Sequence, residues 1–118
     1  MPTCRITAAY TENPQETIVF IGTVGPDNQL AHAQLIGYVK DADGPNEEIG
    51  TYPCIIEPVG RDRAGKIMWG DWNRHHRDFA DHEDINVFLK KMVVGEYLTR
   101  RSDDEEYTYR ITHVVPIG

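Results

Sequence analysis

The feature that most constrains this chain is a strict two-residue alternation near its end, over residues 105–115. Tyr107 and Tyr109 begin an apolar face on every second residue, and polar residues fill most positions between. Such a period is typical of a strand with two different faces. Residues 96–102 are a second strand candidate, and Ser-Asp-Asp at 102–104 supplies a turn between the two. The pattern therefore predicts a β-hairpin at the end of the sequence.

Opposite charges flank the predicted turn. Arg100 and Arg101 precede it, and Glu105 and Glu106 follow it. We expect these side chains to pair across the hairpin, at about 0.2–1 kcal/mol for an exposed pair.

A helix is predicted over residues 82–93, just before the hairpin. Its apolar residues fall at helical spacing on one face: Ile85, Phe88, Leu89 and Met92. Asp81 or Asp84 can cap the first turn, and Gly95 can end the helix with a left-handed backbone angle. Residues 90 and 91 are lysines, which the C-terminal end of a helix favours.

Four earlier stretches have the composition of strands. Residues 3–10 and 16–24 are the first two, and the second is apolar enough to be buried on both faces. Residues 30–40 fit either a strand paired with 16–24 or a helix capped by Asp27 or Asn28, and Gly37 favours the strand. The prolines in 49–59 predict a short or edge strand there, and 66–72 can form another.

Together these elements predict a β-rich fold, mainly β or α+β. We expect a small antiparallel barrel or a bent sheet, with one short helix before a C-terminal β-hairpin. The chain has 118 residues and no linker-like segment, so residues 1–118 are expected to form a single domain.

The chain is acidic, with 19 Asp and Glu residues against 12 Lys and Arg and a net charge of −7. Such a charge repels nucleic-acid phosphates unless the basic residues cluster, so nucleic acid is not expected as a partner. It also fits an inhibitor of a basic nucleic-acid-binding protein, which is one alternative function. No apolar run could span a membrane, and the first residues do not resemble a signal peptide. A soluble cytoplasmic protein with no membrane partner is therefore expected.

Nucleophilic catalysis has little support in the sequence. Ser102 is the only serine and lies in an acidic turn, outside any nucleophile-elbow pattern. Cys54 would need His32 or His113 beside it, and its surroundings are those of a buried strand. Cys4 is the only other cysteine, so two free thiols are expected.

The densest polar cluster lies between residues 71 and 84, with three histidines and five carboxylates. Imidazole and carboxylate groups are ligands for zinc, manganese or iron. The candidate ligands of a divalent metal are His75, His76, Asp78 and His82. Their spacing matches no standard motif, and an exposed loop explains the same composition. A metal-dependent enzyme using the cluster 75–84 is thus a second alternative function, and no other cofactor is expected.

The region just before the predicted helix combines aromatic and basic side chains that have no evident structural task. Its candidate binding residues are Trp69, Trp72, Arg74, His75, His76 and Arg77. Because aromatic and arginine side chains dominate protein interfaces, the sequence predicts a non-catalytic protein-binding or adaptor domain. Homo-oligomers formed through an exposed strand edge would also fit a small β domain.

Overall fold

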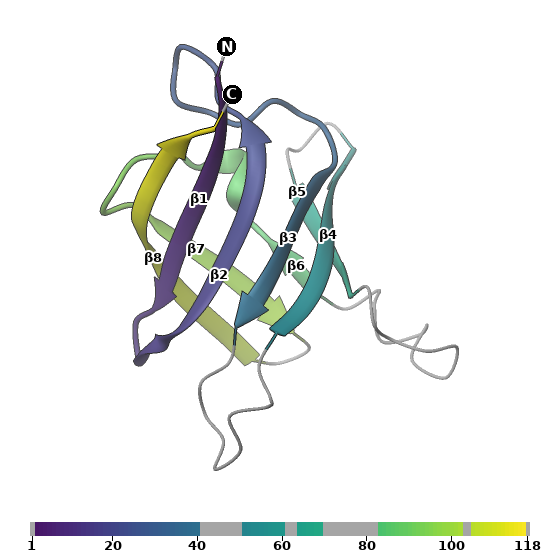
Figure 1. The fold of residues 1–118 in the computed structure, drawn as a ribbon. Helices are drawn as coiled ribbons and strands as arrows, with labels where there is room; N and C mark the ends of the chain where they lie inside the picture. Colours follow the sequence, from purple (N-terminus) through teal and green to yellow (C-terminus); the bar gives the residue numbers. More distant parts are fainter. Residues whose placement is uncertain (1, 41–50, 61–63, 70–82, 103–104, 118) are drawn as a thin grey trace.

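A computed structural model describes residues 2–40, 51–60, 64–69, 83–102 and 105–117, and it shows a closed antiparallel β-barrel of eight strands (Figure 1). The strands are β1 (Thr3–Tyr10), β2 (Asn13–Thr23), β3 (Leu35–Lys40), β4 (Thr51–Val59), β5 (Ala64–Trp69), β6 (Glu83–Ile85), β7 (Tyr97–Ser102) and β8 (Glu105–Pro116). One short 3₁₀ helix, Val87–Leu89, lies between β6 and β7. The predicted β-rich barrel is thus confirmed.

Each strand pairs with the next along the chain, and β8 returns to pair with β1. Every strand that the structure describes therefore has a neighbour on both sides. The expected association through an exposed strand edge loses its basis, because closure of a barrel removes the edges. No helix in the described part of the chain is long and apolar enough to cross a membrane.

The core lies inside the barrel and follows from the alternation along each strand. Its largest fully buried side chains are Tyr109, Phe20, Phe88, Ile6, Ile18, Leu30, Ile56, Ile67, Ile85, Met92, Leu98 and Ile111. Gly37 of β3 sits opposite Phe20 of β2, where a Cβ atom would lie 2.3 Å from the carbonyl oxygen of Val19. Only glycine fits there, because β2 and its phenylalanine occupy the space that a side chain would need.

The predicted hairpin is confirmed in position and register. Its strands are β7 and β8, and Ser102 lies opposite Glu105. Arg101 donates from Nη2 to Glu106 Oε2 at 2.5 Å, as the charge pattern predicts. The prediction for Arg100 is wrong, because this side chain points into the barrel and binds Glu83 of β6. Arg100 is two residues after buried Leu98, so the strand's own period places it inside.

The predicted helix over 82–93 is wrong. The residues that produced its apolar periodicity serve two different elements: Ile85 belongs to β6, and Phe88 lies in the 3₁₀ helix, where it is buried in the core. Leu89 is exposed instead of facing the same side. Asp84 lies in the ladder opposite Arg101 instead of capping a helix, and strand pairing therefore overrides the helical pattern.

The backbone on either side of that region explains why strand pairing prevails. Two hydrogen bonds join Asn86 to Thr99 of β7: the backbone N–H of Asn86 donates to the Thr99 carbonyl at 3.2 Å, and the Thr99 N–H donates to the side-chain oxygen Asn86 Oδ1 at 2.8 Å. Gly95 does take a positive φ of 98°, but in the turn that leads into β7. Asp81, the other predicted cap, lies outside the described residues.

The earlier strand predictions are confirmed with changed bounds. Residues 3–10 form β1, and 16–24 fall largely within β2. The ambiguous stretch 30–40 is a strand from Leu35 onward and pairs with β2, as the strand alternative predicts. The part of 66–72 that is described, up to Trp69, belongs to β5.

The prediction of a short or edge strand at 49–59 is wrong. β4 runs for nine residues and pairs with β3 and β5, although it contains Pro53 and Pro58. In an antiparallel ladder each backbone N–H points to one neighbour only, so a proline removes one bond on one side and the rest of the ladder persists.

Candidate functional site

Most of the residues predicted to form a site lie outside the part of the chain that the structure describes. Trp69, the last residue of β5, is the exception. The others fall in the segment 70–82 between β5 and β6: Trp72, Arg74, His75, His76, Arg77, Asp78 and His82. Whether the histidines and Asp78 converge on a metal therefore remains a prediction. Within the described ranges, no group of three or more His, Cys, Asp or Glu residues could hold a metal ion.

Trp69 belongs to a polar cluster at the end of the barrel where β5 ends and β6 begins, which is the lower end in Figure 1. Its indole N–H donates to Glu83 Oε2. The other carboxylate oxygen, Glu83 Oε1, accepts from Arg100 Nη1 at 2.9 Å. The side chains of Arg100 and Glu83 are only 12% and 13% exposed. Three strands, β5, β6 and β7, are thereby tied together by one buried ion pair and one indole.

Aromatic rings surround the guanidinium group of Arg100. Its central carbon lies 4.4 Å from the ring centroid of Tyr107 and 5.6 Å from that of Trp69. Such contacts stabilise a cation that has lost its water, by about 0.5–2 kcal/mol each. Arg100 Nε is buried and has no hydrogen-bond partner among the described residues. The described residues thus provide an ion pair and ring contacts for the guanidinium group of Arg100, but no hydrogen-bond acceptor for its Nε.

Tyr109 extends the cluster toward β2. Its ring is fully buried, and its hydroxyl donates to Glu16 Oε2 at 2.7 Å. Burial raises the pKa of Tyr109 above its ordinary value. Tyr10 packs against it with ring centroids 5.6 Å apart. The alternation over residues 105–115 places Tyr109 on the apolar face of its strand, but it cannot reveal the hydrogen bond from its hydroxyl to Glu16.

Cys54 lies inside the barrel, and its environment does not activate the thiol. Burial raises the pKa of Cys54 to about 11, so the thiol stays protonated near neutral pH. His32 instead packs edge-on against Phe88 at 5.5 Å, and His113 Nδ1 lies 2.9 Å from the hydroxyl of Thr112. Both histidines are thus exposed and engaged elsewhere, whereas Cys54 is buried and interacts electrostatically with Arg100 and Glu83.

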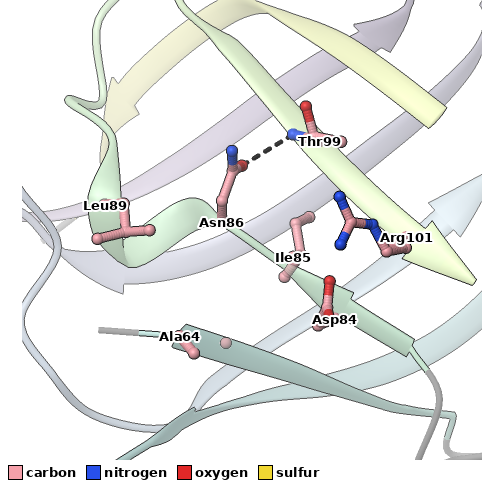
Figure 2. A pocket seen from close by; sticks show the side chains of 8 residues that line it. Ala64, Asp84, Ile85, Asn86, Leu89, Thr99 and Arg101 are labelled. Atoms are coloured by element: carbon pink, nitrogen blue, oxygen red, sulfur yellow. Dashed lines mark hydrogen bonds between the residues drawn. The ribbon is translucent and has the colours of Figure 1, made fainter. Parts of the chain in front are cut away.

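A hollow of about 260 Å³ opens on the outside of the barrel between β5, β6 and β7 (Figure 2). The side chains of Asp84 and Arg101 lie at one end of it, and Asn86 and Leu89 at the other. Two of its polar side chains already have partners, because Asn86 accepts a hydrogen bond from the backbone N–H of Thr99 and Arg101 donates to Glu106.

The outer surface of β2, β3 and β4 carries apolar side chains where a barrel normally exposes polar ones. These three strands lie next to one another in Figure 1. Two rows of directly opposed residues cross them: Ile21, Ile36 and Ile55 in the first, and Val19, Tyr38 and Pro53 in the second. We call these six residues the apolar face. Ile36 at its centre is 67% exposed, Ile21 41% and Tyr38 38%, whereas Val19 is only 7% exposed and contributes little to the surface.

A second hollow, of about 340 Å³, adjoins the apolar face. Ile21 and Ile36 form part of its lining, together with Ala31, Ala33 and Gln34, which precede β3, and Leu35, the first residue of β3. Gly22, Thr3 and Thr23 complete the lining, so the walls are mainly apolar with a few polar groups. The face therefore combines protruding isoleucines with a hollow beside them, which is the shape of an interface that receives a side chain.

Comparison with known proteins adds no relative to this geometry. No protein-family model, no curated protein and no solved structure matches the chain.

Proposed function

We propose that this protein is a non-catalytic protein-binding domain and that its partner docks on the apolar face of β2, β3 and β4. The observation that carries this proposal is the exposure of Ile36, 67%, at the centre of six apolar residues on three adjacent strands. Contiguous exposed apolar surface marks interaction sites in soluble proteins, whereas single exposed apolar residues are ordinary.

The energetic argument rests on what these side chains gain from a partner. Fully burying an isoleucine side chain contributes about 1.5–3 kcal/mol relative to leaving it exposed. Ile21 and Ile36 are directly opposed across β2 and β3, so one partner side chain can contact both. Their burial contributes to affinity, and further contacts on the same face must offset the rest of the entropy cost of association.

The interior supports a binding role over a catalytic one. The buried polar groups of the lower end are directed at one another: Arg100 and Trp69 at Glu83, and Tyr109 at Glu16. Cys54, the thiol nearest this cluster, keeps a raised pKa of about 11. A group that reacts with a substrate needs access and an activated state, and this arrangement supplies neither.

The basic and aromatic residues that follow Trp69 complete the proposal as a second contact region. Trp72, Arg74, His75, His76 and Arg77 belong to the segment that joins β5 to β6. The two strand ends that flank it are tied by the hydrogen bond from Trp69 to Glu83. A segment whose two flanking strands are joined to each other suits recognition, and two separate contact regions would suit an adaptor.

The test replaces Ile36 with glutamate and compares capture of partners from cells that produce the protein. Val94→Glu is the matched control, because Val94 is 63% exposed and lies outside the apolar face. Tagged wild type and Val94→Glu are expected to retain one or more proteins that Ile36→Glu loses, and the purified protein is expected to reproduce the difference. Equal capture by all three variants would contradict the proposal.

A further inference from the structure

The ladder that joins β5 to β6 is the shortest among the described strands. Within the described residues it consists of two opposed pairs, Gly65 with Ile85 and Lys66 with Asp84. β6 and β7 share three pairs, and the other neighbouring strands share at least five. Ile67 and Glu83 come next on β5 and β6, yet they are not part of the ladder. We call this junction the β5–β6 seam, and little backbone pairing closes it.

β6 is attached more firmly on its other side. The Asn86 N–H donates to the Thr99 carbonyl at 3.2 Å, and the Thr99 N–H donates to Asn86 Oδ1 at 2.8 Å. The carboxylate of Glu83 accepts from Arg100 Nη1 at 2.9 Å. These bonds add to the three ladder pairs between β6 and β7. The β5–β6 seam is therefore the junction that needs the fewest backbone bonds broken to separate.

Side chains complete the closure of the seam. The indole N–H of Trp69 on β5 donates to Glu83 on β6, beyond the end of the ladder. At Gly65 the two backbones approach closely, since a Cβ atom there would lie 2.7 Å from the Ile85 carbonyl oxygen. The hollow of about 260 Å³ in Figure 2 lies over the outside of the same strands. A glycine contact and an indole hydrogen bond thus supplement the short ladder.

The closed seam leaves one polar group without compensation. Arg100 Nε is buried and has no hydrogen-bond partner among the described residues, so water that enters on opening would supply an acceptor. Opening also rehydrates the ion pair of Arg100 and Glu83, which is costly to enclose. Ile85 and Phe88 oppose opening, because both side chains are fully buried. The closed form therefore predominates, and the open form is a minor population.

From the short ladder and the uncompensated arginine together, we propose that the barrel opens along the β5–β6 seam while its other strands stay paired. The hydrogen bond from Trp69 to Glu83 holds the seam closed. In the open form, water and small molecules reach the lower interior between β5 and β6, and in the closed form they do not. This inference goes beyond the proposed function and does not depend on the apolar face.

The two buried thiols make the opening measurable in the unmodified protein. Cys54 lies opposite Trp69, next to the seam, and Cys4 lies on β1 between β2 and β8; their exposed fractions are 2% and 3%. The folded full-length protein is alkylated with N-ethylmaleimide, and each rate is divided by the rate for the same thiol in the unfolded chain. Cys54 is expected to react faster than Cys4 by about tenfold or more.

Urea identifies the kind of opening that each thiol reports. Local opening exposes little surface, so the Cys54 rate should change little at low urea, whereas the Cys4 rate should rise steeply because it requires global unfolding. Equal rates for the two thiols with the same urea dependence would overturn the inference.

Gly65→Ala tests whether the opening lies at the seam. Its methyl group would meet the Ile85 carbonyl oxygen and force the strands apart, and position 65 is four residues from Trp69, so Cys54 is not uncovered directly. Labelling of Cys54 is expected to rise about tenfold, with that of Cys4 unchanged. Gly60→Ala is the matched control, because its φ is 65° and no atom lies within 4 Å of its Cβ. An unchanged Cys54 rate in folded Gly65→Ala, or an equal rise in Gly60→Ala, would place the opening elsewhere and overturn the proposal.

Hydrogen exchange tests the role of the indole. Trp69→Phe keeps an aromatic ring but removes the donor to Glu83, so amide exchange in β5 and β6 should accelerate while that in β1 and β2 stays the same. Arg101→Ala, which removes an exposed side chain from β7, is expected to leave exchange in β5 and β6 close to that of wild type. Acceleration in every strand, or none in β6, would show that Trp69 does not hold the seam closed.

Discussion

Proteins usually bury apolar side chains and expose charged ones, and two regions of this barrel do the reverse. These regions are the interior of the lower end and the apolar face. The interior encloses a charged pair, Arg100 and Glu83, whereas the face exposes isoleucine at its centre. The enclosed pair has partners from the same chain: the indole of Trp69 bonds Glu83, and the rings of Trp69 and Tyr107 lie beside Arg100. Ile36 has no comparable cover among the described residues, since most of its side chain remains exposed.

This difference suggests how to distinguish side chains placed for stability from side chains placed for binding in this protein. A buried charged group whose partners come from the same chain has a structural role, although such ion pairs often do not add net stability. An exposed apolar group that nothing in the chain covers has no such explanation. We therefore expect changes in the interior to affect stability and changes on the face to affect binding.

Removing one member of the interior pair should have the largest effect. Arg100→Ala leaves the carboxylate of Glu83 enclosed without its cation, which costs about 3–5 kcal/mol of unfolding free energy. Urea denaturation followed by tryptophan fluorescence measures this change. Arg101→Ala is the control, since the Arg101–Glu106 pair is exposed and should contribute no more than about 1 kcal/mol. Similar losses from both variants would refute the distinction between the two arginines.

Alkaline pH should weaken the interior through Cys54. The thiol ionises near its ordinary pKa of 9.0 in the unfolded chain but stays protonated to about 11 in the folded one. Between these values unfolding releases a proton, so the free energy of unfolding falls as pH rises, by about 2–3 kcal/mol in total. Chemical denaturation between pH 8 and 11.5 should show less of this decline in Cys54→Ala than in wild type. An identical decline in both proteins would show that the thiol is not responsible.

A methyl group on Gly37 should destabilise the barrel wall on which the apolar face lies. Its Cβ would meet the carbonyl oxygen of Val19 at 2.3 Å and the Cβ of Phe20 at 2.8 Å. Strand movement to relieve these contacts should cost about 1–3 kcal/mol, as overpacking generally does. The thermal midpoint of Gly37→Ala is therefore expected to fall, whereas Gly60→Ala tests only the cost of a positive φ, because nothing lies within 4 Å of that Cβ. An unchanged midpoint in Gly37→Ala would show that β2 and β3 can separate freely.

The smallest expected effect on stability is that of Ile36→Glu. Substitutions at exposed positions usually change the unfolding free energy by less than about 0.5 kcal/mol, and the lower strand propensity of glutamate adds up to about 1 kcal/mol. Urea denaturation of Ile36→Glu and Val94→Glu should therefore give curves close to that of wild type. A loss of several kcal/mol in Ile36→Glu would mean that the isoleucine supports the fold and would remove it as a marker of binding.

Much of the fold could be predicted from local patterns. Alternation locates β8, and strand-forming composition locates β1, β2 and β7. The expectation that β2 is buried on both faces is wrong, because Ile21 on its outer side is 41% exposed. The helix over 82–93 fails because Ile85, Phe88 and Met92 are spaced as on a helix but reach the core from a strand, a 3₁₀ turn and an irregular segment. No local pattern could separate these cases, since the pairing of Asp84 with Lys66 and Arg101 is set by distant strands.

The candidate sites were less accessible to sequence reasoning. The sequence predicts Trp69 as a residue of a binding surface, but its indole N–H donates a hydrogen bond to Glu83 on the next strand. The apolar face depends on the register of three strands, which places Ile21 beside Ile36 and Ile36 beside Ile55. In the sequence each of these isoleucines is an ordinary strand residue. Only the pairing of β2, β3 and β4 shows that together they make the outer surface of the barrel apolar.

The central claim is tested most directly by photo-crosslinking in cells that produce the protein. A benzophenone amino acid is placed at position 36 on the apolar face and, in parallel, at position 94, which is almost equally exposed but lies outside it. The account predicts a discrete crosslinked partner from position 36 that is absent from position 94 and reduced by Ile21→Glu. Equal crosslinking from both positions, or none from position 36, would contradict it.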